Sequence, residues 1–220
     1  MTNDMRQMTK QGRQIESDSF SIIDEEIETL HGGHNFNQGE WNVVRRAIHT
    51  TGDFEYAKLY QFSDNAIESA ITALKNGANI ITDVSMIVTG LNQTRLNAYG
   101  NKAQCFISHP DVISTAKETG ETRAIHSMRY ARDNGLLDGS IIGVGNAPTA
   151  LLELLRMIEA GEAKPALIIG IPVGFVKADE SKQALTEQNT VPYIASLGRK
   201  GGSPLVVSTI HALLAESVNE

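Results

Sequence analysis

The sequence contains only one cysteine, Cys105. A single thiol cannot form an internal disulfide, and it excludes a metal cage built from several cysteines. Free cysteine is among the most frequently buried residue types, and Cys105 stands in an apolar run, so we expect a small hydrophobic side chain rather than a nucleophile. A reducing cytoplasm suits this cysteine usage best.

Long hydrophobic stretches are also missing. No run approaches the ~18 consecutive apolar residues that a membrane-spanning helix requires. Residues 1–13 are polar and lack the apolar core of a signal peptide. We therefore expect a cytoplasmic protein with no membrane partner, and we expect residues 1–12 to be a flexible N-terminal segment.

An excess of positive charge is absent as well. The formal net charge is -7 and the sequence pI is about 5.4, whereas a nucleic-acid binder usually shows a basic field. These values argue against nucleic acid as a partner, but an acidic small molecule stays compatible because a few local cations recognise it. With 41% hydrophobic residues and no Pro- or Ser-rich linker, residues 1–220 are predicted to form a single domain.

Apolar periodicity predicts the fold class. Helical spacing predicts three helices in the first third of the chain: residues 12–30, 38–51 and 65–76. Short apolar runs predict five strands: residues 79–82, 104–108, 140–144, 166–170 and 192–196. Such strands, separated by helices, indicate an α/β fold with a mainly parallel sheet covered on both faces. The ligand of such a sheet lies beyond the carboxyl ends of its strands.

One candidate site is the end of the second predicted helix. There His49 lies just before a turn at Gly52, and Arg46, three residues earlier, lies beside it on the helix surface. A titratable group and a cation can meet an anionic ligand at such a point. The alternative is a helix C-terminus closed by Gly52, where His49 interacts with the last carbonyl groups.

Residues 141–155 follow the order strand, tight loop, helix. Gly145 and Asn146 permit unusual backbone angles, and Pro148 suits the first turn of a helix that begins near Thr149. The helix N-terminus would present free backbone N–H groups to an anion. The glycine spacing does not match Gly-x-Gly-x-x-Gly, and no Walker loop occurs, which argues against a nucleotide- or S-adenosylmethionine-dependent transferase.

Three separated motifs resemble those of the precorrin-8X methylmutase family and its cobalt-substrate members. They are Arg-x-x-His at 46–49, Gly-Asn-Ala-Pro-Thr at 145–149 and Pro-Val-Gly-Phe-Val at 172–176, within a resemblance that runs from about residue 12 to residue 214. It implies an isomerase of cobalamin biosynthesis that moves a methyl group from C-11 to C-12 of (cobalt-)precorrin-8, giving hydrogenobyrinic or cobyrinic acid. It further implies no cofactor, since any cobalt enters with the corrinoid substrate, and a homodimer that can hand its product to the next pathway enzyme.

The resemblance also implies a set of site residues. His49 aligns with the family's catalytic histidine, and imidazole suits proton transfer because its pKa is close to neutrality. Ser19 and Arg46 match substrate-contacting positions, and an arginine can pair with a carboxylate through two hydrogen bonds. Further candidate contacts are Arg123, Asn146 and Thr149. For Arg123 the alternative is a solvated charge on a helix face.

The other histidines have structural alternatives. His31 and His34 flank a glycine pair without further metal ligands nearby, so we expect exposure and no protein metal site. His126 and His211 lie in helical patterns and are expected to be packing or surface residues. His109 follows a strand, and it either lines the cleft or is structural.

Two later segments carry cations. Lys177 and Ser181 are expected to cap a helix rather than contact substrate. Arg199 and Lys200 lie in a glycine-bounded turn before a helix that begins near Ser203, which is typical of an anion site and equally of exposed basic residues. A non-catalytic corrinoid carrier with the same pocket is the main functional alternative, and the pairing of His49 with Arg46 favours catalysis over it.

Overall fold

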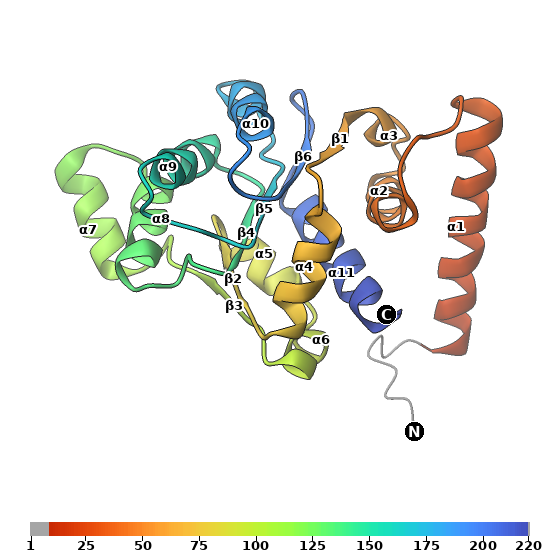
Figure 1. The fold of residues 1–220 in the computed structure, drawn as a ribbon, viewed down its shortest axis with the longest axis horizontal. Coiled ribbons are helices and arrows are strands. Elements are labelled where there is room, and N and C mark those ends of the chain that lie inside the picture. The colour runs from red at the N-terminus through yellow and green to blue at the C-terminus, as the bar shows by residue number, and fades with distance from the viewer. Residues whose placement is uncertain (1–8, 220) are drawn as a thin grey trace.

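The computed structural model describes residues 9–219, which form six strands and eleven helices (Figure 1). The strands are β1 (Tyr60–Phe62), β2 (Asn79–Thr82), β3 (Lys102–Cys105), β4 (Ile141–Val144), β5 (Leu167–Gly170) and β6 (Tyr193–Ser196). The helices are α1 (Lys10–Leu30), α2 (Gln38–Thr51), α3 (Tyr56–Leu59), α4 (Ala66–Lys75), α5 (Ser85–Gly90), α6 (Gln93–Tyr99), α7 (Pro110–Thr119), α8 (Arg123–Asp133), α9 (Pro148–Glu159), α10 (Ala178–Glu187) and α11 (Ser203–Asn219).

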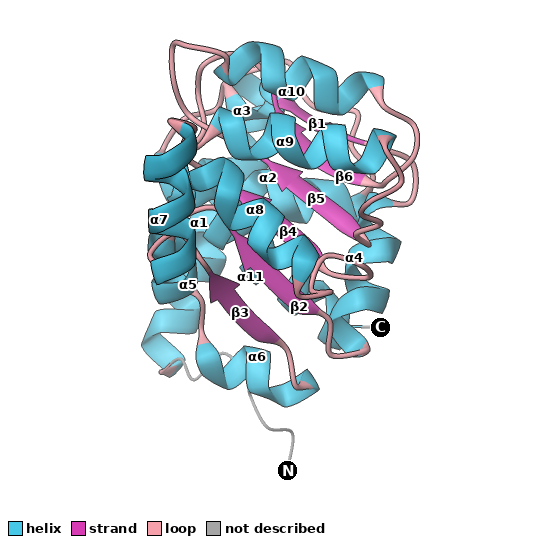
Figure 2. Ribbon diagram, turned by 90° about the vertical axis from the view of Figure 1, so that its left-hand side faces the viewer, coloured by secondary structure: helices cyan, strands magenta, loops and turns pink. Residues whose placement is uncertain are grey.

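The strands form one sheet in the order β1-β6-β5-β4-β2-β3. All neighbouring pairs are parallel except β1 and β6, which are antiparallel with Tyr60 opposite Ser196. The arrowheads of the parallel strands therefore point the same way, toward the side where α7 lies in Figure 2. We call this side the carboxyl edge, and it is where the ligand of a parallel sheet is expected.

Each central strand contributes to two hydrophobic cores. Ile80 packs into the first core and Ile81 into the second, and Ile141 and Ile142 alternate in the same way. This alternation follows from the two-residue repeat of a strand. Because both faces are buried, the strands read as continuous apolar runs, which is why the sequence revealed them.

The two faces of the sheet are covered by different numbers of helix layers. On the first face α4, α5 and α11 pack together, α2 packs on α11, and α1 packs on α2. On the second face lie α8, α9 and α10, with α7 on α8. The outermost helices, α1 and α7, consequently stand at opposite ends of the molecule (Figure 1). Among residues 9–219 no helix is both long and apolar enough to cross a membrane.

The predicted helices are confirmed, with small differences at their ends. α2 has the predicted bounds because Asn37 and Glu40 form a capping box and Gly52 closes the C-terminus in a left-handed conformation (φ 67°). α1 begins at Lys10, since the Thr9 hydroxyl accepts a hydrogen bond from the Gly12 N–H. The expected flexible segment 1–12 therefore overlaps this helix, and its first eight residues lie outside the described residues.

The α/β class and the mainly parallel sheet are confirmed, whereas two edge strands differ from prediction. The interval 104–108 is wrong for β3, which ends at Cys105, because Phe106 and Ile107 belong to a loop that packs against the second core. β1 was not predicted, since three residues are too few for a periodic pattern. Cys105 is a free thiol in β3. Its side chain is half-buried, whereas the sequence predicted a buried one.

Candidate active site

The first part of the site lies where α1 meets α2. His49 is exposed in the last turn of α2, and its ring meets the Phe20 ring of α1 edge-on, with 5.4 Å between centroids. The Gly52 N–H donates to the Ile48 carbonyl and closes the helix. The imidazole is thus oriented by Phe20 and left open to a ligand.

Arg46 lies beside His49 but already has a carboxylate partner. Its guanidinium donates to Glu16 of α1 at 2.9 Å and lies 5.2 Å from the centre of the Phe20 ring. The Ser19 hydroxyl donates to the Ile15 carbonyl at 2.7 Å. The structure therefore brings Arg46 and His49 to Phe20, which Ser19 directly precedes in α1, and we call Ser19, Arg46 and His49 the helical side of the site.

The second part of the site lies at the carboxyl edge. Asn146 is exposed in the loop after β4, and the Thr149 hydroxyl is 3.0 Å from that of Thr122, which caps α8. Arg123 is the first residue of α8 and is exposed, and no carboxylate within residues 9–219 pairs with it. We call Arg123, Asn146 and Thr149 the sheet side.

The Gly145 loop binds an anion, but that anion is part of the protein. The buried Asp83 carboxylate accepts hydrogen bonds from the N–H groups of Gly145, Asn146 and Ala147 at 3.1, 2.8 and 2.7 Å. These loop N–H groups precede α9, and the predicted free N–H groups at the start of the helix are not found at Ala150 and Leu151, which both donate to the Ala147 carbonyl. Burial raises the pKa of Asp83, and the three N–H donors oppose this rise. Asp83 fixes the loop that carries Asn146 and Thr149.

A salt bridge connects the segment after α2 with the turn after β6 at the carboxyl edge. Lys200, in the turn after β6, donates to the carboxylates of Asp53 and Glu55, which follow α2 directly. The hydrogen bond from Lys200 lowers the pKa of Asp53, and both carboxylates raise the pKa of Lys200. Within residues 9–219, no hydrogen bond or ring contact joins His49 directly to the sheet side. Lys200 thus links the segment after α2 to the carboxyl edge.

Two glycines allow the loops of the carboxyl edge to approach one another. A Cβ atom on Gly145 would lie 2.8 Å from the backbone of Ser203, and one on Gly201 would lie 2.3 Å from the Ile171 carbonyl oxygen. Both distances are too short for any other residue. The turns after β4, β5 and β6 are therefore in close contact.

The remaining histidines have structural partners. His31 stacks on Phe54 and is exposed, whereas His34 is half-buried on Trp41, so exposure holds only for the first. His109 caps α7 and approaches the Tyr130 hydroxyl at 3.1 Å, which supports its structural role. The packing roles of two others are confirmed: His126 contacts Thr119, and His211 accepts from the Asn92 N–H. In the part of the chain from 9 to 219, no three His, Cys, Asp or Glu side chains are grouped to hold a metal ion.

The segment before α10 is structural where the sequence indicated a cap. The buried Ser181 hydroxyl donates to the Ala178 carbonyl at 2.9 Å. Lys177 occupies the N-cap position in a left-handed conformation (φ 59°) with no side-chain cap bond, and its side chain is exposed. Ser181 is therefore structural but lies inside α10 and does not cap it, and Lys177 occupies the cap position without capping through its side chain.

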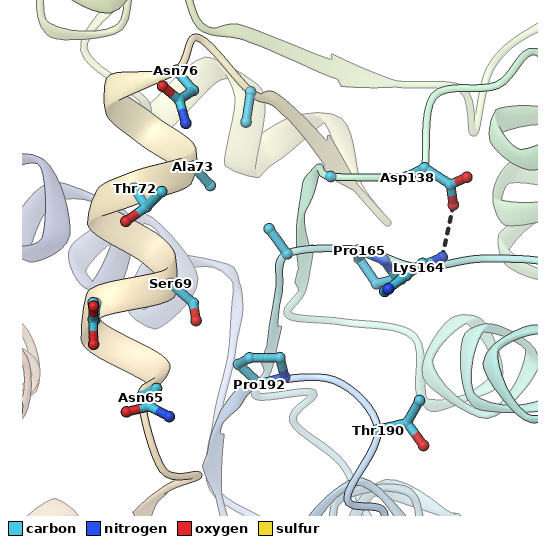
Figure 3. A pocket seen from close by; sticks show the side chains of 14 residues that line it. Asn65, Ser69, Thr72, Ala73, Asn76, Asp138, Lys164, Pro165, Thr190 and Pro192 are labelled. Atoms are coloured by element: carbon cyan, nitrogen blue, oxygen red, sulfur yellow. Dashed lines mark hydrogen bonds between the residues drawn. The ribbon is translucent and has the colours of Figure 1, made fainter.

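A groove of about 870 Å³ lies at the other end of the sheet. Figure 3 shows it between α4, with Asn65, Ser69 and Thr72, and the turns that precede β4, β5 and β6. The Lys164 N–H donates to Asp138 on its far wall. None of the predicted site residues lines this groove, which lies at the edge of the sheet opposite to the carboxyl edge.

Several features of the site could not be found from motifs. Glu16, Phe20 and Asp83 each act on a predicted residue, yet each lies far from it in the sequence. Only Asp83 carried a signal, because it follows a predicted strand directly. Taken together, the fold and the candidate site are those of an α/β enzyme class in which the ligand is expected at the carboxyl edge, and the candidate residues include one histidine and several arginines.

Comparisons with known proteins agree with this class. The model of the family described as precorrin-8X methylmutase matches residues 14–216. A cobalt-precorrin-8 methylmutase from Leptospira interrogans is 52% identical, covering 96% of each chain, and one from Methanocaldococcus jannaschii is 44% identical, covering 98% of this chain and 99% of its own. A crystal structure of precorrin-8X methylmutase from Thermus thermophilus superposes with a TM-score of 0.88 at 50% identity, covering 94% of this chain and 97% of its own. The chain belongs to the precorrin-8X methylmutase family, a family of isomerases.

Proposed function

We propose that this chain moves a methyl group from C-11 to C-12 of precorrin-8, with His49 as the catalytic residue. The product is hydrogenobyrinic acid, or cobyrinic acid when the substrate carries cobalt. One observation carries the proposal: in a chain of this family, the exposed imidazole of His49 stands at the end of α2, one salt-bridge link from the carboxyl-edge loops. Catalysis needs this exposure because the group must reach the ligand.

The chemistry requires no additional reactant. The bond between the methyl carbon and C-11 breaks while the bond to C-12 forms, so no atom enters or leaves the macrocycle. Electron density shifts within the ring, and a proton donor or acceptor near a pyrrole nitrogen assists this shift. Imidazole serves in either role near neutral pH, and the edge contact with Phe20 orients it. No cofactor is needed, and cobalt arrives as part of the substrate.

The peripheral carboxylates of the substrate require hydrogen-bond donors. Arg123 offers a guanidinium without a carboxylate partner among the described residues, and Asn146 and Thr149 offer neutral donors nearby. On the helical side, a substrate carboxylate replaces Glu16 as the partner of Arg46. Ser19 lies on α1, the helix that carries Glu16. These five residues form the proposed binding set.

The proposed assembly is a homodimer. Ile15, Ile22 and Leu30 are large apolar side chains exposed on α1, which is the outermost helix beside the site. Apolar residues repeated along one helix favour contact with a partner, and two-fold dimers are the commonest soluble assembly. Light scattering at micromolar concentration should give about twice the chain's 23.9 kDa. A monomer with full activity on dilution would remove the dimer from the proposal.

The relatives suggest which form of the substrate is preferred. Three relatives at 52%, 44% and 44% identity are named cobalt-precorrin-8 methylmutases, whereas the Thermus thermophilus structure at 50% and a relative from Sinorhizobium at 38% are named precorrin-8X methylmutases. We therefore propose the cobalt form as the better substrate. A cytoplasmic location, with hand-over of product to the next enzyme of the pathway, is consistent with this role.

The test uses purified, dialysed protein and substrate labelled at the migrating methyl group. Cobalt-containing and metal-free precorrin-8 are supplied separately, and absorption spectra follow product formation without any added donor. Conversion with complete retention of the label supports an intramolecular shift. Tight binding of the product without conversion would indicate the carrier instead, and a requirement for S-adenosylmethionine, nicotinamide or flavin would refute the isomerase.

A further inference from the structure

The segment between β5 and α10 exposes large apolar side chains. Phe175 is 83% exposed, Val176 79% and Val173 44%. Soluble proteins seldom display such side chains next to one another unless a ligand or partner covers them. The segment follows the carboxyl end of β5, so this surface belongs to the edge where the ligand is expected.

Backbone hydrogen bonds hold this segment in a defined position. The Val173 N–H donates to the Gly145 carbonyl at 3.4 Å, and the Gly174 N–H donates to the Arg199 carbonyl at 3.1 Å. The Gly202 N–H donates to the Ile171 carbonyl at 2.9 Å. The apolar side chains are thus displayed from a backbone that both neighbouring loops support.

Arg199 adds a cation to the apolar surface. Its guanidinium lies 5.3 Å from the centre of the Phe175 ring, within the range of a cation–π contact. No carboxylate in the described part of the chain pairs with it. The two side chains together present an apolar ring face and, at its border, hydrogen-bond donors for an anion.

Helix α10 fixes the turn that carries Arg199. The Asp179 carboxylate accepts from the Gly198 N–H at 2.9 Å, and the buried Lys182 ammonium donates to the Lys200 carbonyl at 2.9 Å. Lys200 then reaches Asp53 beyond the end of α2. The position of Arg199 is therefore defined relative to both sides of the site.

We propose that Phe175 and Arg199 form a platform that binds one face of the tetrapyrrole macrocycle, with Phe175 against the ring and Arg199 on a peripheral carboxylate. This inference rests on the proposed function. The substrate has an apolar ring face bordered by carboxylates, and the platform has an apolar face bordered by a guanidinium. Charge and shape thus match, and the Gly145 carbonyl joins the platform to the loop that carries Asn146.

The test compares Phe175→Ala and Arg199→Gln with the parent, and uses Val218→Ala as the control. Val218 is an exposed apolar residue near the end of α11, so its truncation removes exposed apolar area elsewhere. Dissociation constants are measured for cobyrinic acid and for a corrinoid whose peripheral carboxylates are all amidated. The molecular mass of every variant is measured at the same concentrations.

Two different patterns are expected. Phe175→Ala should weaken both corrinoids by about tenfold, because the ring contact does not depend on charge. Arg199→Gln should weaken only the carboxylated corrinoid, by about ten- to a hundredfold. The control should bind both ligands like the parent, and all variants should keep the parent's mass.

Unchanged binding in both variants would overturn the platform. If Phe175→Ala has a lower molecular mass than the parent but binds both corrinoids equally well, the platform is overturned. Phe175 would then contact a second copy of the chain. Parent conversion of precorrin-8 is measured in the same series. If the parent binds corrinoid without converting it, the proposed function fails while the platform stands. Conversion by the parent with unaffected binding in both variants eliminates the platform alone.

Discussion

The two sides of the site treat their cations differently. On the helical side, Arg46 pairs with Glu16 at 2.9 Å and Arg45 pairs with Asp24 at 2.6 Å. At the carboxyl edge, neither Arg123 of the sheet side nor Arg199 of the platform has a carboxylate partner in residues 9–219. Both sides are basic in sequence, but only the sheet side keeps that charge available.

This difference separates binding from chemistry. The Arg46 and Glu16 side chains are only 17% and 14% exposed, so opening their pair costs more than opening a pair at the surface. A substrate carboxylate displaces nothing when it reaches Arg123. We therefore expect the sheet side to supply most of the affinity and the helical side, with His49, to supply the reaction.

Replacing the catalytic group should have the largest effect. His49→Ala should lower turnover by about 10²–10⁴-fold, because a positioned proton donor or acceptor contributes this much to rate. Product affinity should change little, and the free energy of unfolding by less than about 1 kcal/mol, since an exposed histidine at a helix end contributes no more. Single-turnover absorption and product titration measure these quantities, with His31→Ala as the control. An unchanged rate would remove His49 from the catalytic role.

Breaking the support of the sheet side should cost stability as well as activity. Asn has one acceptor oxygen where Asp83 has two, and its amide hydrogens face backbone N–H groups. Asp83→Asn should lower the free energy of unfolding by on the order of 3 kcal/mol, and should weaken product binding through Asn146 and Thr149. Urea unfolding and titration are the measurements. A variant as stable as the parent would show that the three N–H groups do not depend on this carboxylate.

The comparison of the two arginines is tested directly by binding. Arg123→Ala should weaken product binding by about ten- to a hundredfold, which is the loss of one charge-assisted hydrogen bond. Arg46→Ala should weaken it less, because its gain is offset by the pair with Glu16. Glu16→Gln should tighten binding by freeing Arg46. Equal losses at both arginines, with no effect at Glu16, would erase the distinction between the sides.

The last effect concerns acid stability beneath the helical side. Burial, followed by the nearby Arg95 and Arg46, lowers the pKa of His211 to about 4. The unfolded chain takes up this proton near pH 6.5, so the stabilisation is complete above pH 6.5 and is lost as the pH falls toward 4. By pH 5 the loss should reach about 2 kcal/mol.

Urea unfolding at pH 7, 6 and 5, compared with His211→Gln, isolates this contribution. The parent should lose more stability than the variant, and Arg46→Ala should lose less than the parent because one of the depressing charges is gone. Parallel curves for the parent and His211→Gln would contradict the lowered pKa.

Local signals explain why parts of the fold could be predicted. The capping residues Asn37 and Glu40 and the closing Gly52 gave α2 its bounds, and the buried run at 79–82 gave β2. β3 is an edge strand with Lys102 exposed, so its apolar pattern was weak and the prediction moved onto the following loop. Helix caps and buried strands can thus be predicted from neighbouring residues in the sequence, whereas the bounds of an edge strand depend on the elements that pack beside it.

The sequence predicted which residues belong to the candidate site, but not which residues they bond to. The motifs identified His49, Arg46 and Asn146, since each belongs to a compact segment. The partner of Arg46 is 30 positions away, and the partner of the Asn146 N–H is 63 positions away. No periodicity reports such contacts. The sequence therefore predicts that an anionic ligand binds at the Gly145 loop, whereas the anion found there is the Asp83 carboxylate.

The link between Lys200 and Asp53 has a consequence for the order in which the protein is made. These residues are 147 positions apart, and among the described residues β1 pairs in the sheet with β6 alone. A nascent chain emerges from its N-terminus, so α1, α2 and His49 are synthesised long before their support at the carboxyl edge. Contacts this distant in sequence form late, because a long loop must close first. This link thus forms only after residue 200 has been synthesised, and a chain that stops before residue 200 carries the histidine without the salt bridge that joins the end of its helix to the sheet.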